Sequence, residues 1–224
     1  MFSHSNGLIA QLSAADQALL IKNSRLKEFK RGDVLTDAHV LQSSCFFLTR
    51  GAVALFVSAK PPSLDHGLTV GLIGREGAVG LQALWGMPSG HFSWLVQSDG
   101  FAYELAAQAL RRMVQSRPHW RELFSRYLWT LYQDIAQLAA DSHRQDIQTR
   151  LADWLLRSAD RCGSDDLVMT QTHIAQMLGV RRASITQAAN IMKEKGWLSY
   201  VRGQITLLDR EGLASTLGRG KTVR

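Results

Sequence analysis

The feature that most constrains the fold is the pattern of small, apolar and glycine residues between positions 169 and 209. Apolar residues recur at helical spacing on both sides of Gly179, where a helix has to stop and the chain turns sharply. Thr170 is placed to cap the first helix, and a second helix is expected to begin around Arg181 and to end at Gly196. The inward-facing residues of the two helices are Ile174, Ala175, Leu178, Ile185, Ala188, Ala189 and Met192. This spacing is typical of a helix-turn-helix.

Two short β-prone segments follow the second helix. The segments are "WLSYV", which begins at Trp197, and "QITLL", which begins at Gln204. Arg202 and Gly203 lie between them and supply a turn, so we expect a two-stranded hairpin with Arg202 at its tip. Two helices followed by such a hairpin predict a winged helix.

The outer face of the second helix carries side chains that can read a DNA duplex. Its first two turns hold Arg181, Arg182, Ser184 and Gln187. Arginine can pair with guanine, glutamine with adenine, and serine with a base or a phosphate. Residues at the N-terminus of such a helix reach base edges, so Arg182 is expected to contact a base, with a phosphate as the alternative.

The remaining candidates for the DNA surface are Thr170, Gln171 and His173, which are expected to face the phosphate backbone, and Arg202 at the hairpin. We therefore predict a DNA-binding domain, and the alternative is a winged helix that contacts only proteins.

The distribution of charge supports a polyanionic partner. The whole chain has 224 residues and a formal net charge of +7. From Thr170 to the end there are nine basic and three acidic residues, so nearly all of the excess lies in the last quarter. A basic tail that only aids solubility is the alternative that charge alone leaves open.

Composition places the chain among globular, cytoplasmic proteins. It is 46% hydrophobic and 20% charged, and it is long enough for two ordinary domains or one large one. No apolar run approaches the ~18 residues that span a membrane, and the N-terminus lacks the pattern of a secretory signal. Cys45 and Cys162 are too few for an iron–sulfur or zinc site, so no metal is expected. We interpret them as reduced structural thiols, with redox sensing by Cys162 as the alternative.

The sequence pattern of the first half of the chain predicts an antiparallel sandwich or barrel over residues 20–108. One amphipathic helix is expected first, over residues 8–28, with Ser13 as its cap. Residues 45–57 are predicted to form two strands about a turn at Arg50–Gly51, because β-branched and aromatic residues flank the glycine. Further strands are expected in "LTVGLIG" and "FSWLVQSDGFAYEL".

A long helix is expected after this region, starting at Pro118. Its apolar residues are spaced 4, 3, 4 and 3 apart, which is a heptad seam. The residues of this seam are Phe124, Leu128, Leu131, Ile135 and Leu138. We interpret the seam as a dimer interface, because the stripe is narrow and Tyr127, Trp129 and Tyr132 beside it are aromatic. The alternative is a helix packed on its own domain's core. A further helix is predicted over residues 146–160.

Taken together, these segments resemble the Crp/Fnr family of bacterial transcription regulators. The resemblance rests on "FKRGDVL", "FFLTRGAVALF", "GLIGREGAVGL" and "MTQTHIAQMLGVRRASITQAANIMKEKGWLSY". It implies an α+β chain with a β-roll sensor domain over residues 1–108, linking dimerisation helices over 109–143 and a winged-helix domain over 144–224. It also implies a homodimer on a two-fold symmetric operator, control by the β-roll domain, and contact with RNA polymerase in many members. Ala183 replaces a glutamate that is common in the family, so the familiar half-site does not carry over.

Glycines at positions 71, 74, 77 and 80 raise the question of a bound nucleotide. Relatives that bind cyclic AMP have a Gly-Glu pair here and an Arg-Ser or Arg-Thr pair some ten residues later. In this chain Leu81 follows Gly80, and the later pair falls at about His91–Phe92, with no arginine between Arg75 and Arg111. A buried phosphate without a cation is costly. We therefore interpret the glycines as turns of the β-roll and expect no control by cyclic AMP.

Another effector in the same region is the alternative, and its identity is not predicted. The residues that would line such a cavity are Gly80, Leu81, Trp85, His91, Phe92, Trp94 and Tyr103. The aromatic residues Trp85, Phe92, Trp94 and Tyr103 are better interpreted as plain core. His39, His66 and His91 are scattered candidates for a haem ligand and are better interpreted as surface residues, so no cofactor is expected.

Two functions from other classes compete with a transcription regulator. One is a small-molecule sensor whose DNA binding is weak or vestigial. The other is a nucleotide-dependent enzyme, but "GLIGREGAVG" lacks the Gly-Lys-Ser/Thr ending of a P-loop and the helix that follows a dinucleotide fingerprint. We therefore expect no enzymatic activity and no membrane partner.

Overall fold

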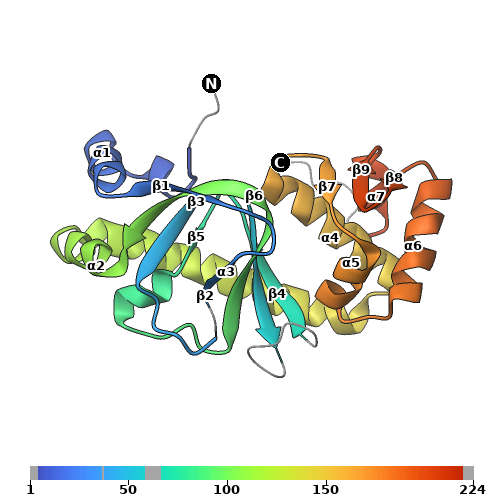
Figure 1. Ribbon diagram of the computed structural model, residues 1–224, viewed down its shortest axis with the longest axis horizontal. Helices are drawn as coiled ribbons and strands as arrows, with labels where there is room; N and C mark the ends of the chain where they lie inside the picture. The colour runs from blue at the N-terminus through green and yellow to red at the C-terminus, as the bar shows by residue number, and fades with distance from the viewer. Residues whose placement is uncertain (1–4, 37, 59–66, 219–224) are drawn as a thin grey trace.

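The computed structural model describes residues 5–36, 38–58 and 67–218. A β-roll forms one lobe and a smaller helical domain forms the other, and the long helix α3 (Pro118–Arg144) runs behind the sheet from one lobe toward the other (Figure 1). His66 and the last three basic residues of the sequence, Arg219, Lys221 and Arg224, lie outside the described residues.

The N-terminal helix is shorter than the sequence pattern predicts. A 3-10 turn η1 (Ile9–Gln11) precedes helix α1 (Ala14–Lys22), and Ser13 caps α1 by accepting a hydrogen bond from the backbone N–H of Asp16. The expected helix over 8–28 is therefore wrong beyond Lys22. Residues 25–29 form strand β1 instead, because β6 offers them a ladder of backbone partners.

The β-roll is antiparallel throughout its described strands. The sheet runs in the order β1-β6-β3-β4, with β2 paired to β6 and β5 paired to β3. Its elements are β1 (Arg25–Phe29), β2 (Val34–Thr36), β3 (Ser44–Ser58), β4 (Gly67–Ile73), β5 (Ala78–Val79), the 3-10 turn η2 (Leu81–Trp85) and β6 (Phe92–Ala106). The strands predicted in "LTVGLIG" and "FSWLVQSDGFAYEL" are confirmed as β4 and β6.

The prediction of two strands about Arg50–Gly51 is wrong. Residues 44–58 form one bent strand, β3, whose two halves pair with the same partner, since Phe47 lies opposite Tyr103 and Phe56 opposite Ser93 of β6. The register shifts between Leu48 and Val53. Gly51, at φ +83° and close to the backbone of β6, supplies a bend in the strand rather than a reversal.

Three helices follow the roll and lead into the second lobe. They are α2 (Ala107–Ser116), α3 (Pro118–Arg144) and α4 (Ile147–Cys162). Pro118 is the first residue of α3, as predicted, and the extended Gln145 separates α3 from α4. Asp146 caps α4 by accepting a hydrogen bond from the N–H of Thr149.

The residues of the seam predicted on α3 as a dimer interface contact their own chain to different extents. Phe124 is fully buried beside Phe47 and Trp120, and Leu128 packs on the same cluster. Leu131 and Ile135 pack on the core of the roll, while Leu138 lines a cleft beside β4. Phe124 therefore packs inside its own domain, as the alternative expects, whereas Leu138 remains half-exposed at the cleft. A narrow apolar stripe indicates that one helix face is covered, but it does not indicate whether the same chain or a second chain covers it.

The C-terminal domain has the predicted winged-helix arrangement. Its elements are β7 (Asp166–Val168), α5 (Gln171–Leu178), α6 (Arg182–Glu194), β8 (Leu198–Val201), β9 (Gln204–Leu207) and α7 (Arg210–Ser215). Thr170 caps α5 through its hydroxyl oxygen, and Gly179 ends it in the left-handed conformation. The wing is a three-stranded sheet in the order β7-β9-β8.

The glycines at every third position seat the helices on the roll. A Cβ at Gly71 would lie 3.5 Å from Ile135 of α3, and one at Gly74 would lie 2.8 Å from the Cα of Arg161 in α4. A Cβ at Gly77 would overlap the hydroxyl of Tyr127. Gly80 adopts φ +89° at the start of η2. Gly71, Gly74 and Gly77 therefore lie on the surface against which α3 and α4 pack, whereas Gly80 adjoins Ser44 and Gln42. The prediction that these glycines are turns is wrong for Gly71, which lies inside β4.

Gly77→Ala is expected to destabilise the fold, because the new methyl group displaces the half-buried Tyr127 ring and its hydrogen bonds to Ala78. Overpacking of this kind costs about 1–3 kcal/mol. Gly71→Ala is the matched control, since its methyl group meets only ordinary van der Waals contacts. Urea unfolding measures both variants, and equal losses of unfolding free energy would contradict the packing argument.

Candidate nucleic-acid interface

Helix α6 separates a buried face from an exposed one. Ile185 and Met192 are fully buried, and Ala188 and Ala189 lie beside them. On the opposite side, at the N-terminal end of the helix, the candidate side chains Arg181, Arg182, Ser184 and Gln187 are exposed or half-exposed. The four predicted residues are therefore accessible to solvent in the first two turns of α6.

Contacts between α5 and α6 fix the position of that surface. The Thr186 hydroxyl lies 2.6 Å from Gln171 Oε1 and 3.1 Å from the carbonyl oxygen of Arg182. The backbone N–H of Gln171 also donates to the Tyr200 hydroxyl at 3.3 Å. Gln171 is half-buried, so its side chain holds α6 against α5, a role that the sequence pattern did not indicate.

The wing tip lies where the sequence predicts it. Arg202 (φ +48°) and Gly203 (φ +83°) form the two-residue turn between β8 and β9. A Cβ at Gly203 would lie 3.4 Å from the Thr170 methyl group, so the tip of the wing adjoins the start of α5. Arg202 and Thr170 are exposed.

His173 points away from this surface. Its Nε2 lies 2.7 Å from Oε1 of Gln97 on strand β6, and the side chain is half-buried. Because Gln97 Oε1 is an acceptor, Nε2 carries the proton and donates. Burial, and to a smaller extent Arg31, lowers the pKa of His173. The expectation that His173 faces a phosphate backbone therefore does not fit its position, and His173 instead joins the winged helix to the roll.

Further contacts join the β-roll to the second lobe at the boundary where His173 meets Gln97. Arg31 donates to the carbonyl of Val168 at 2.8 Å. Ser98 Oγ lies 3.2 Å from Cys162 Sγ. The Arg31–Val168 contact joins residues separated by 137 positions, so nothing local in the sequence signals it. The apolar core also crosses the seam and includes β-roll residues Ala52, Ala54, Phe56, Leu72 and Leu95.

The two cysteines are protonated thiols in this environment. Burial raises the pKa of Cys45 to about 12, and the Arg111 charge offsets only part of that shift. Burial also raises the pKa of Cys162, against the effect of its contact with Ser98. A protonated thiol is a poor nucleophile.

The residues proposed for an effector cavity are divided between different parts of the described roll. Leu81 and Trp94 are buried in different apolar clusters, whereas Trp85 is 42% exposed. His91 is exposed and contacts the ring of His39 edge to face at 4.7 Å. Two cavities of about 330 and 450 Å³ lie elsewhere, and none of these residues lines either one.

Within the described ranges, no group of three or more histidine, cysteine, aspartate or glutamate side chains is arranged to hold a metal ion. None of the helices in those ranges combines the length and the apolar character needed to cross a membrane.

Comparison with known proteins agrees with this geometry. Residues 149–216 match a family described as the Crp-like helix-turn-helix domain. No curated protein sequence matches the chain. Among solved structures, a putative transcriptional regulator of the Crp/Fnr family from Eubacterium rectale has a TM-score of 0.72 at 17% identity, covering 94% of this chain and 97% of its own.

Two further structures match over most of their length. FixK2 from Bradyrhizobium japonicum has a TM-score of 0.72 at 14% identity, covering 86% of this chain and 96% of its own. A Crp/Fnr-family transcriptional regulator from Thermus thermophilus has a TM-score of 0.69 at 21% identity, covering 88% of this chain and 100% of its own. These likenesses establish the fold, and the expected α+β architecture of β-roll, long helix and winged helix is confirmed.

Acidification is expected to weaken the attachment of the winged helix to the roll. The pKa of His173 is lowered below its usual 6.5 in the folded chain, so the unfolded chain binds the proton more tightly. The stability that neutral His173 contributes is therefore complete above pH 6.5 and is lost as the pH falls below that value. Urea unfolding between about pH 5 and 8 should show this acid-side loss.

The variant His173→Gln tests this assignment, because its amide can still donate to Gln97 without titrating. We expect it to flatten the acid-side slope of the unfolding free energy. His91→Gln, which changes an exposed histidine, is the control and should leave the slope as it is. A slope in His173→Gln equal to that of the unchanged protein would contradict the assignment.

Proposed function

We propose that the protein is a sequence-specific DNA-binding transcription regulator of the bacterial cytoplasm. The premise is that residues 149–216 match the Crp-like helix-turn-helix domain and that the chain has a Crp/Fnr fold. The observation that carries the proposal is helix α6, which is buried along one face and presents two adjacent arginines at the N-terminal end of the other. Nothing in the proposal requires catalysis. Contact with RNA polymerase is part of the proposal, and its only support is the resemblance to the Crp/Fnr family.

In this proposal α6 enters the major groove of the duplex. Arg182 and Gln187 read base edges, with Arg181 and Ser184 contacting a base or a phosphate from the first turn. Arg202 at the wing tip and Thr170 at the start of α5 contact the flanking backbone. Gln171 acts indirectly, because its side-chain oxygen is engaged by Thr186.

A homodimer is the second part of the proposal, with an interface that differs from the predicted seam. An exposed stripe of α3 carries Trp129, Tyr132, Ala136 and Ala139 at heptad spacing. Trp129 and Tyr132 are 61% and 60% exposed, and their rings stack at 5.4 Å. Large aromatic rings of this kind contribute strongly when an interface covers them, and the two alanines allow a second helix to approach closely.

Two copies joined along α3 would present two α6 helices, one for each half of a symmetric operator. The symmetry of the operator then follows from the symmetry of the dimer.

Replacing Arg182 with alanine is expected to relax sequence preference. Loss of one bidentate base contact costs about 1–3 kcal/mol of discrimination. Gel-shift titration against promoter fragments should show a salt-sensitive specific complex that loses its preference in the variant. Lys195→Ala, which removes the same charge at the other end of α6, is the control. Weak and equal binding to all DNA would favour a sensor with vestigial DNA binding.

Placing a charge on the aromatic stripe is expected to separate the dimer. A central aromatic residue in such an interface contributes ~2 kcal/mol or more, so Trp129→Glu should weaken association at least about 30-fold. Analytical ultracentrifugation measures this. Leu41→Glu alters a similarly exposed apolar residue (59%) on the roll and serves as the control. Should Trp129→Glu sediment with the same association constant as the unchanged chain, the proposed face is not the interface.

A further inference from the structure

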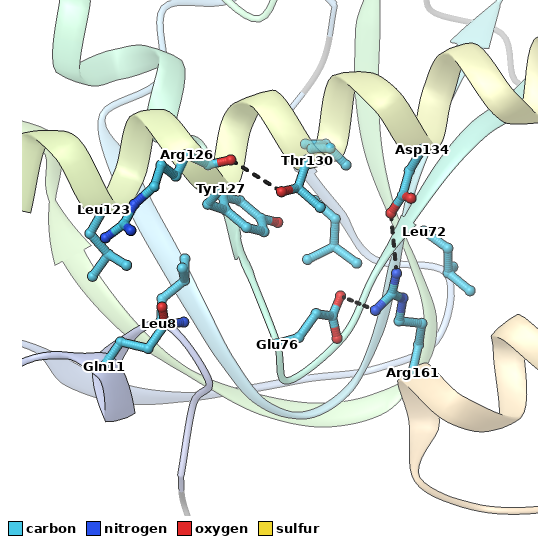
Figure 2. A pocket seen from close by; sticks show the side chains of 12 residues that line it. Leu8, Gln11, Leu72, Glu76, Leu123, Arg126, Tyr127, Thr130, Asp134 and Arg161 are labelled. Carbon is cyan, nitrogen blue, oxygen red and sulfur yellow. Dashed lines mark hydrogen bonds and ion pairs between the residues drawn. The ribbon is translucent and has the colours of Figure 1, made fainter. Parts of the chain in front are cut away.

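A cavity of about 330 Å³ lies at the junction of four segments of the chain. The N-terminal turn, the end of β4, α3 and the last turn of α4 line it, with α3 forming one long wall (Figure 2). The apolar part of its lining includes Leu8, Leu72, Ile73 and Leu123, which are all nearly inaccessible to solvent. No residue of α6 lines this cavity, and Ile73 and Leu131 connect it to the core of the roll.

One end of the cavity is formed by a chain of three charged side chains. Figure 2 shows Arg161 reaching from α4 between Glu76, in the turn after β4, and Asp134 on α3. Arg161 Nη1 lies 3.1 Å from Glu76 Oε1, which also accepts from the backbone N–H of Gly74 at 2.8 Å. Arg161 Nη2 lies 3.4 Å from Asp134 Oδ2. The Arg161–Glu76 pair is thus anchored to the backbone of the roll.

The Arg161–Asp134 pair is the looser of the two. Its 3.4 Å separation exceeds the ~2.7–2.9 Å of a well-formed charge-assisted hydrogen bond. The two side chains remain 26% and 39% exposed. An exposed pair of this kind contributes little to stability, so a ligand can separate its members at small cost.

We propose that this cavity binds a free α-amino acid with a large aliphatic or aromatic side chain. Such a molecule carries a carboxylate and an ammonium group side by side, and the cavity offers a guanidinium and a carboxylate side by side. The ligand carboxylate pairs with Arg161 and its ammonium with Asp134, while its side chain lies over Leu8 and Leu123.

The other lining groups agree with a zwitterion. The charged residues of the lining are two cations, Arg126 and Arg161, and two anions, Glu76 and Asp134. This balance disfavours a nucleotide, whose phosphates would meet the two carboxylates without a surplus of cations. The volume is at the lower end of the ~300–1,000 Å³ usual for ligand sites, which suits a molecule of amino-acid size.

Binding at this place would reach the DNA-binding domain directly. Arg161 lies in the last turn of α4, within the Crp-like domain, whereas Asp134 lies on the helix that packs on the roll. A ligand held by both alters the seam between the two lobes. That consequence rests on the proposed function, and the binding itself does not. By linkage, DNA must change the affinity for the amino acid by the same factor as the amino acid changes the affinity for DNA.

Isothermal titration of the full-length protein with L-leucine, L-methionine and L-phenylalanine tests the proposal. We expect saturable binding of at least one of the three. Leucinamide lacks the carboxylate, N-acetylleucine lacks the ammonium group, and glycine lacks the side chain, so each should bind at least about tenfold more weakly than leucine. Absence of binding by all three amino acids, or equal binding of leucine and its two blocked forms, overturns the proposal.

The variant Asp134→Asn locates the site. It keeps the shape of the side chain and removes the charge that meets the ammonium group, so affinity should fall at least about tenfold. Glu211→Gln, which neutralises an exposed carboxylate on α7, should leave binding unchanged. Unchanged binding in Asp134→Asn overturns the assignment to this cavity.

Gel-shift titration of the same preparations separates the two proposals. DNA binding without amino-acid binding rejects only the ligand, and amino-acid binding without sequence-specific DNA binding rejects only the proposed function.

Discussion

The close approach of two helices to the β-roll is the constraint on which the rest of this structure depends. It requires residues without bulky side chains on the roll, and the chain supplies Gly74 and Gly77 for α4 and α3 and Ala52 and Ala54 for the shared core. A side chain at Gly74 would collide with the backbone of α4 near Arg161. Because that backbone runs on into β7 and α5, the position of the winged-helix domain is set by the surface of the roll.

Patterns confined to one element could be predicted from the sequence. The cap at Thr170, the stop at Gly179 and the buried face around Ile185 are local features of about two helical turns, and each is where the pattern places it. The same holds for Arg202 at the hairpin tip. These features depend on backbone geometry and on the helical period, which neighbouring residues determine by themselves.

Features that depend on distant partners could not be predicted in the same way. Gly51 reads as a reversal because its flanks are β-prone, yet both flanks pair with one long strand that lies some fifty residues further along the chain. Phe124 belongs to a heptad stripe whose partner is the roll rather than a second chain. His173 has the spacing of a backbone-contacting residue, but its Nε2 donates to Gln97, 76 positions away. In each case the pattern identified a constrained residue and left its partner open.

The distribution of these long-range contacts has a consequence for control of the winged helix. The seam between the lobes has polar contacts at both ends: His173 with Gln97 at one, and Arg161 with Glu76 and Asp134 at the other. Neither end includes a residue of the exposed face of α6. Since α6 is fixed to α5 by its own buried face, a shift at either end moves the whole domain as one body. In the proposed regulator, a signal received at this boundary can therefore change DNA affinity without contacting the side chains proposed to read bases.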